Sequence, residues 1–163
     1  IAILAWHQVE LSEMQTLHKS DLQLATHRIV AGGKVIQLTI EHFNILKRFA
    51  ELDVHKGFPS HKTQVYVSSP FLMRSAKRSN LNPNNIHQTI QRFNAIAVDY
   101  GKEISFLNLK RNGIFSRVYD AADDDKTANA LIQELTGCDT AFAFGYKEFY
   151  ERWKHLITGG GQI

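Results

Sequence analysis

Hydrophobic and polar positions follow different rhythms along this chain. Within Ala2–His18 the apolar residues recur at roughly helical spacing, which predicts an amphipathic helix. Between Leu22 and Thr39, short alternating runs flank Gly32–Gly33, a pair typical of a tight hairpin turn. The pattern therefore predicts a helix followed by two or three short antiparallel strands.

Three helices are expected next. Thr39 is a good N-cap for a helix with an apolar stripe of Phe43, Leu46, Phe49 and Ala50. A long loop, 53–68, should follow. Serine or asparagine before proline then marks two helix starts, which predicts a short helix over Phe71–Ser79 and a longer one over Pro83–Tyr100.

The last third of the chain begins with an Asn112–Gly113 pair between two apolar-rich runs. This is a strong hairpin signal and predicts a β-hairpin over Ile104–Tyr119. The cluster Asp123–Asp125 should cap a helix that continues through Leu135 and ends at Gly137. A final helix is expected over about 145–157.

Strands, two helices, a longer polar helix and a hairpin, in that order, are typical of a winged helix-turn-helix. The expected fold class is α+β, with additional terminal helices around that domain. We expect an N-terminal helix at 1–20, a winged-helix domain at 21–120 and a helical extension at 121–163. The chain starts at Ile1 without signal-peptide features, so we expect it to be a fragment of a longer protein.

Charge is unevenly distributed. The net charge is +3, but residues 56–118 hold ten Lys or Arg against Asp99 and Glu103, or 10 − 2 = +8. A basic middle suggests a surface for phosphates, and a solvated basic face is the alternative. No apolar run is long enough to span a bilayer, so no membrane partner is expected. A single cysteine, Cys138, points to a reducing, cytoplasmic compartment.

The segment 21–46 adds a family resemblance. After its strands, this segment follows the pattern Leu-Thr-x-x-Glu-Phe-x-x-Leu-Leu at Leu38, Thr39, Phe43 and Leu46. His42 stands where the pattern has Glu. This pattern resembles the opening of the OmpR/PhoB-type response-regulator effector domain. The resemblance as a whole covers about residues 21–120. The resemblance implies a prokaryotic, DNA-binding transcription regulator. A similar module is found in some CRISPR-associated proteins that sense cyclic oligonucleotides.

The candidate partner is double-stranded DNA, with 83–100 as the reading helix and 104–119 as the wing. Amides pair with adenine and arginine with guanine or phosphate, whereas wing cations reach phosphates. The candidate residues are Asn84, Gln88, Gln91 and Arg92 on the reading helix, Arg74, Lys77 and Arg78 before it, and Lys110, Arg111 and Arg117 in the wing.

Aromatic residues in the last helix favour a second function, protein contact or homodimerisation within a larger effector. Core packing is the other interpretation of these residues, which are Tyr146, Phe149, Tyr150 and Trp153. An accessory role in RNA processing or nuclease action is a third hypothesis. No catalytic residue, cofactor or metal site is expected, because the histidines lack ligand spacing and Cys138 lacks a basic neighbour. We therefore expect the chain not to be an enzyme.

Overall fold

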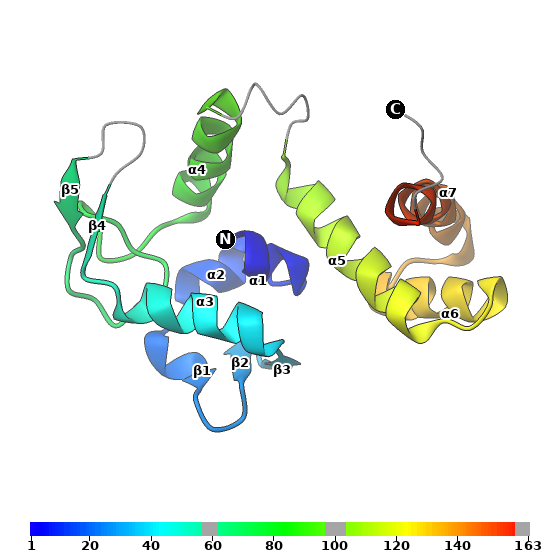
Figure 1. Ribbon diagram of the computed structural model, residues 1–163, viewed down its shortest axis with the longest axis horizontal. Helices are drawn as coiled ribbons and strands as arrows, with labels where there is room; N and C mark the ends of the chain where they lie inside the picture. Colours follow the sequence, from blue (N-terminus) through cyan, green and yellow to red (C-terminus); the bar gives the residue numbers. More distant parts are fainter. Residues whose placement is uncertain (57–61, 97–103, 159–163) are drawn as a thin grey trace. The chain divides into compact units, whose positions relative to one another are not determined.

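A computed structural model describes residues 1–56, 62–96 and 104–158 (Figure 1). The fold class is α+β, with seven α-helices and small antiparallel sheets in the described residues. The chain divides into two compact units, residues 1–106 and 107–163, called the first and second unit below. This division falls after residue 106, and the domain bounds expected at residues 20 and 120 stay a prediction.

The N-terminal segment forms two short helices in place of one. They are α1 (Ala2–Trp6) and α2 (Leu11–Thr16). The break contains Gln8, whose φ of 66° is left-handed and cannot continue a helix. A capping box then starts α2, in which Glu10 N donates to Glu13 Oε2 at 2.7 Å.

The expected strands are confirmed, and they form an antiparallel sheet in the order β1-β2-β3. Their bounds are β1 (Leu22–Gln23), β2 (Arg28–Ala31) and β3 (Lys34–Gln37), after a 3₁₀ turn η1 (Lys19–Asp21). Gly32 and Gly33 make the predicted turn, both with positive φ. A Cβ on Gly32 would collide with the carboxylate of Glu13, so the turn is packed directly against α2.

The helix expected after Thr39 is also confirmed, as α3 (Ile40–Glu51). The Thr39 side chain accepts a hydrogen bond from His42 N at 3.1 Å, and the apolar face buries Phe43 and Leu46. Part of the loop expected at 53–68 is a two-stranded antiparallel sheet that the sequence analysis missed. Its strands are β4 (Val54–Lys56) and β5 (Thr63–Val65).

The short helix expected over Phe71–Ser79 is wrong, because the segment is an ordered loop. Its backbone groups bond to a distant part of the chain in place of their own helix. Leu72 N donates to Leu17 O at 2.8 Å, and Pro70 O accepts from Lys19 N at 2.8 Å. These bonds satisfy the backbone outside a helix, and Leu72 is buried where the loop is fastened.

The longer helix is confirmed as α4 (Pro83–Ile96). Asn82 caps it, because Asn82 Oδ1 accepts from Asn85 N at 2.9 Å. Ile86 and Ile90 are buried, whereas Phe93 is 55% exposed. The last expected residues of this helix, from Ala97 to Tyr100, lie outside the described residues.

The hairpin expected over Ile104–Tyr119 is wrong. The chain forms a single helix there, α5 (Phe106–Ala121), and the Asn112–Gly113 pair lies inside it. The apolar residues Ile114, Phe115 and Val118 fall on one helical face and are buried. Burial of that face outweighs the local turn preference. The structure therefore has no wing at 104–119.

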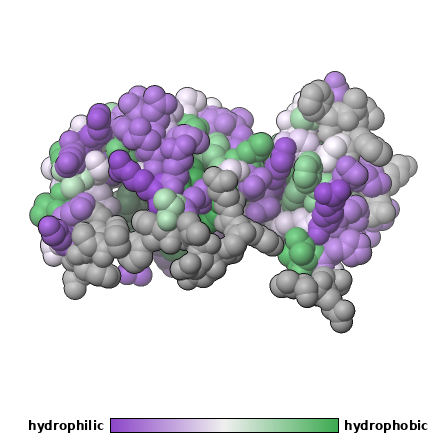
Figure 2. All heavy atoms as spheres, turned by 90° about the horizontal axis from the view of Figure 1, so that it is seen from above, coloured by the Kyte–Doolittle hydropathy of each residue, from purple (hydrophilic) through white to green (hydrophobic). Residues whose placement is uncertain are grey.

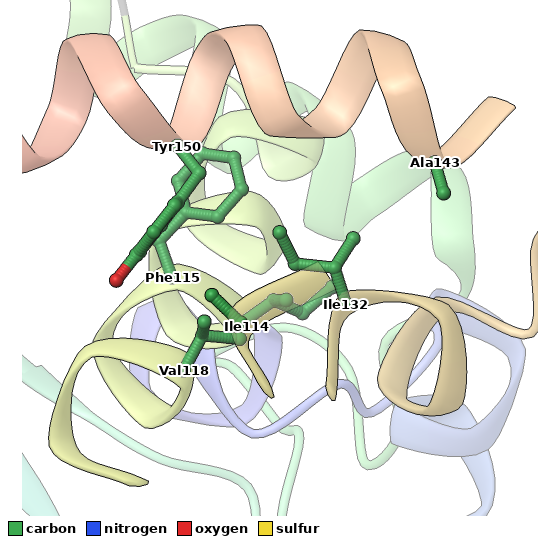
Figure 3. Packing of buried hydrophobic residues seen from close by; sticks show 7 residues of the cluster. Ile114, Phe115, Val118, Ile132, Ala143 and Tyr150 are labelled. Carbon is green, nitrogen blue, oxygen red and sulfur yellow. The ribbon is translucent and has the colours of Figure 1, made fainter. Parts of the chain in front are cut away.

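The second unit is a bundle of three helices, α5, α6 (Asp125–Thr136) and α7 (Thr140–Ile157). The predicted caps of α6 are confirmed. The Asp124 side chain accepts from Thr127 N at 2.7 Å, and Gly137 ends the helix with a φ of 64°. Figure 3 shows the core, in which Phe115 of α5 and Tyr150 of α7 have ring centroids 5.7 Å apart.

Candidate nucleic-acid interface

The candidate site begins with the register of α4. Asn82 caps this helix at its start. Along the helix, polar side chains at positions i, i+3, i+4 and i+7 share one face because of the helical repeat. These four are Asn85, Gln88, Thr89 and Arg92, and all of them line one groove. They lie next to the buried Ile86 and Ile90 stripe, so packing of that stripe holds the polar face in place.

The loop before α4 supplies two further cations. Leu72 and Met73 are buried, which anchors the loop, while Lys77 and Arg78 remain exposed. The Ser75 hydroxyl oxygen accepts from the backbone N–H groups of both cations, at 3.2 and 3.1 Å. This turn directs the two exposed residues to the same side as the groove face of α4.

Loop, helix and strand β5 together form a groove of about 710 Å³, called the cationic groove. Its described lining residues include three cations and no carboxylate. They are Gln64, Ser75, Ala76, Lys77, Arg78, Leu81, Asn85, Gln88, Thr89 and Arg92. Residues 54–98 contain no Asp or Glu at all. The space-filling view in Figure 2 shows hydrophilic residues over much of the visible surface. The three cations and the lack of a carboxylate among its described lining residues make the groove suitable for anions.

The residues that the sequence proposed on α4 separate into two groups. Gln88 and Arg92 line the cationic groove, whereas Asn84 and Gln91 are exposed and are not among its lining residues. The sequence analysis missed Asn85 and Thr89. Counting helical positions from Asn85 in place of Asn84 would have found the stripe.

Arg74 is not a surface cation, contrary to our expectation. Its side chain is 1% exposed, and Nη2 donates to Ala50 O at 3.1 Å and to Leu52 O at 2.7 Å. Nη1 donates to Val67 O at 3.2 Å and lies 3.7 Å from the carboxylate of Asp53. Arg74 therefore joins its own loop to the end of α3 and to the segment after β5, and its charge is not exposed for a phosphate on the surface.

The cations assigned to the wing lie on α5 in the second unit, all of them half-buried. The guanidinium of Arg111 lies over the Phe149 and Tyr146 rings, 4.8 and 5.5 Å from their centroids. Arg117 Nε donates to Gly113 O at 3.2 Å, and burial lowers the pKa of its guanidinium. Lys110 completes the set. Arg111 and Arg117 thus serve packing within the bundle rather than a hairpin tip.

The aromatic residues proposed for dimerisation are mainly core residues of the second unit. Tyr150 is buried, Tyr146 and Trp153 pack against the core, and Phe149 remains 46% exposed. Core packing, the other interpretation that the sequence left open, therefore accounts for three of the four.

The described residues contain neither a metal-binding cluster nor a membrane-spanning helix. No group of three or more His, Cys, Asp or Glu side chains lies where it could hold a metal ion. Among the described helices, none combines the length and apolar character needed to cross a membrane.

Comparison with known proteins gives a fold relationship alone. No protein-family model matches the chain, and no curated protein matches it significantly. One solved structure with a similar fold is described as the crystal structure of XerA recombinase, with a TM-score of 0.64 and 18% sequence identity. The similarity covers 96% of this chain and 56% of the recombinase chain, so this chain spans just over half the length of that relative.

Proposed function

We propose that the first unit binds double-stranded DNA, with the backbone of one strand in the cationic groove. The observation that carries this proposal is the groove lining, in which Lys77, Arg78 and Arg92 surround amide side chains without a carboxylate. Phosphates are the anions that such a surface binds most readily in a nucleic acid. The groove face of α4 also offers Gln88, whose amide can read a base edge.

The similarity to XerA recombinase supports the proposal, because a recombinase acts on DNA. That support concerns DNA binding only. The wing that we expected at 104–119 is not formed, because helix α5 occupies that segment. Transcription regulation, the response-regulator resemblance, the cytoplasmic location and the absence of enzymatic activity stay predictions.

The test is fluorescence anisotropy on the whole chain with a labelled 20-base-pair duplex at three salt concentrations. The double variant Lys77→Ala/Arg78→Ala should weaken binding to every sequence. It should lower the slope of log K against log salt by about two units, since each phosphate contact releases roughly one counterion. Lys34→Ala is the matched control, because Lys34 is an exposed cation of the same unit outside the groove. An unchanged slope in the double variant would place DNA elsewhere and refute the proposal.

A selected DNA site would separate the two glutamines of α4. Gln88→Ala should weaken binding to that site by about 1–3 kcal/mol if its amide contacts a base edge. Gln91→Ala should leave binding unchanged, because Gln91 does not line the groove. Equal losses in both variants would mean that DNA contacts α4 through a face other than the one that lines the cationic groove.

Protein contact remains the second candidate function, now restricted to the exposed part of α7. Phe149 and Leu156 are 46% and 62% exposed on that helix, although both are large and apolar. Sedimentation of the whole chain at tens of micromolar tests self-association. A dimer that Leu156→Glu abolishes would support this candidate, and a monomer at all concentrations would exclude homodimerisation.

A further inference from the structure

A second groove adjoins the cationic groove in the first unit. It has a volume of about 470 Å³, and we call it the apolar groove. Aliphatic and aromatic side chains of α1, α3 and the loop before α4 form much of its wall, among them Ile3, Ile45, Phe49 and Leu81. The two grooves share five lining residues, so they adjoin each other. These are Gln64, Ser75, Ala76, Leu81 and Thr89.

The apolar groove also contains aromatic rings and a buried donor. The Phe49 and Tyr66 rings meet edge to face with centroids 6.0 Å apart, and the Arg74 guanidinium lies 5.2 Å from the Tyr66 centroid. Arg74 Nε is buried and has no hydrogen-bond partner among the residues that the structure describes. A buried N–H group is expected to have an acceptor. Because this N–H group is closed off from the surface, what the groove offers a ligand is its rings and aliphatic walls, which suit a flat apolar body.

The whole cleft thus has a different chemistry at each end. One end has rings and aliphatic walls, and the other has three cations without a carboxylate among the described lining residues. Side chains that both donate and accept, Gln64 and Thr89, lie in the shared part. A nucleotide has the matching order, because its planar base carries acceptors and its sugar connects that base to phosphates. The apolar end lies within the range of about 300–1,000 Å³ typical of small-molecule sites.

We propose that the first unit holds a DNA nucleotide whose base has left the stack, with the base in the apolar groove and its phosphates in the cationic groove. This inference rests on the proposed function, since it names the form of DNA that the site prefers. Removing a base from a duplex requires unstacking, so a base that is already unpaired should be the better ligand. Contacts between a base and protein rings then add affinity that paired DNA does not gain.

The experiment compares three labelled duplexes by anisotropy with the whole chain. One is fully paired, one carries a single unpaired thymine as a bulge, and one carries an abasic residue in the same bulge. The thymine bulge should bind at least about fivefold more tightly than the other two. The abasic bulge is the essential control, because it matches the flexibility and charge of the thymine bulge and lacks only the base.

Two variants that fill the apolar groove test the location. Ile45→Trp should remove the preference for the thymine bulge while leaving affinity for the paired duplex unchanged, because Ile45 lines the apolar groove and not the cationic groove. Asn44→Trp is the matched control, because Asn44 is exposed on the same helix and lines neither groove. Ile3→Trp, on α1, is a second filling variant and gives the same test should the α3 variant fail to fold.

The outcomes separate this inference from the proposed function. Equal affinity for the thymine and abasic bulges, with paired DNA still bound through Lys77 and Arg78, overturns the inference alone. A preference that survives both filling variants also overturns it, since the base would then be held elsewhere. No measurable binding of the unchanged chain to any of the three duplexes at low salt would overturn both.

Discussion

Helices α4 and α5 have similar lengths and both carry asparagines and cations, yet they use them in different ways. On α4, Ile86 and Ile90 are buried, Phe93 is exposed, and the polar stripe faces an open groove. On α5, arginines lie against aromatic rings or a backbone carbonyl of their own bundle. The difference shows that the number of cations in a segment does not determine whether they meet a ligand. What matters is whether each guanidinium already has a partner within its own unit.

The largest test of this comparison removes one phenylalanine from each helix. Phe115→Ala on α5 should lower the free energy of unfolding by about 3–5 kcal/mol, because Phe115 is 2% exposed within the core. Phe93→Ala on α4 should change it by less than about 1 kcal/mol, because Phe93 is 55% exposed. Urea denaturation followed by circular dichroism measures both. Similar losses in the two variants would mean that α4 packs as α5 does.

The next largest effect concerns the two arginines of the loop before α4. Arg74→Ala should destabilise the first unit by about 2–4 kcal/mol, since Ala50 O and Leu52 O would lose their buried donor. Arg78→Ala should leave stability nearly unchanged and weaken DNA binding. Thermal unfolding and anisotropy on the same samples separate the two roles. A stable Arg74→Ala variant that loses DNA binding would restore Arg74 as an interface residue.

A smaller effect is expected when each helix loses an arginine. Arg111→Ala should lower the free energy of unfolding by about 1 kcal/mol through lost contact with the Phe149 ring, and leave DNA binding unchanged. Arg92→Ala should instead leave the free energy of unfolding unchanged and weaken DNA binding. It should lower the slope of log K against log salt by about one unit. If Arg111→Ala changes the salt slope instead, the second unit also contacts DNA.

The smallest effect is a pH dependence at Tyr66. Burial raises the pKa of this phenol, which the positive charge of Arg74 partly offsets. A raised pKa favours the neutral phenol in the folded state, so its contribution to stability is present below pH 10 and is lost as pH rises above that range. The fall in melting temperature between pH 9 and 11 should be shallower in Tyr66→Phe than in the wild type. Tyr119→Phe, a more exposed tyrosine, should follow the wild type.

Local signals explain what the sequence predicted correctly. Thr39 and Asp124 cap helices with their own side chains, and Gly32–Gly33 turn the chain where positive φ is needed. Each of these features depends on a few neighbouring residues, so the sequence contains the information. Gln88 and Arg92 were found for the same reason, because helical spacing fixes which side chains share a face.

The errors come from contacts between distant residues. The Asn112–Gly113 pair favours a turn locally, but burial of the Ile114, Phe115 and Val118 face decides for a helix. Pro70 and Leu72 bond to the segment around Leu17 and Lys19, which no local pattern reveals. Arg74 looks like any surface cation until its carbonyl partners are known. The sequence therefore predicted exposed polar residues on α4, whereas the exposed positions it expected for Arg74, Arg111 and Arg117 are wrong.

The packing of Gly32 against Glu13 has a consequence for the evolutionary history of this chain. A side chain added at position 32 would push the Glu13 carboxylate away from its capping bond to Glu10 N, and the φ of 55° there favours glycine in any case. Shortening Glu13 would remove the collision but leave the backbone requirement, and asparagine or aspartate would then be the residues best tolerated. A change at position 32 should therefore be tolerated better in a descendant that already has a shorter residue at position 13.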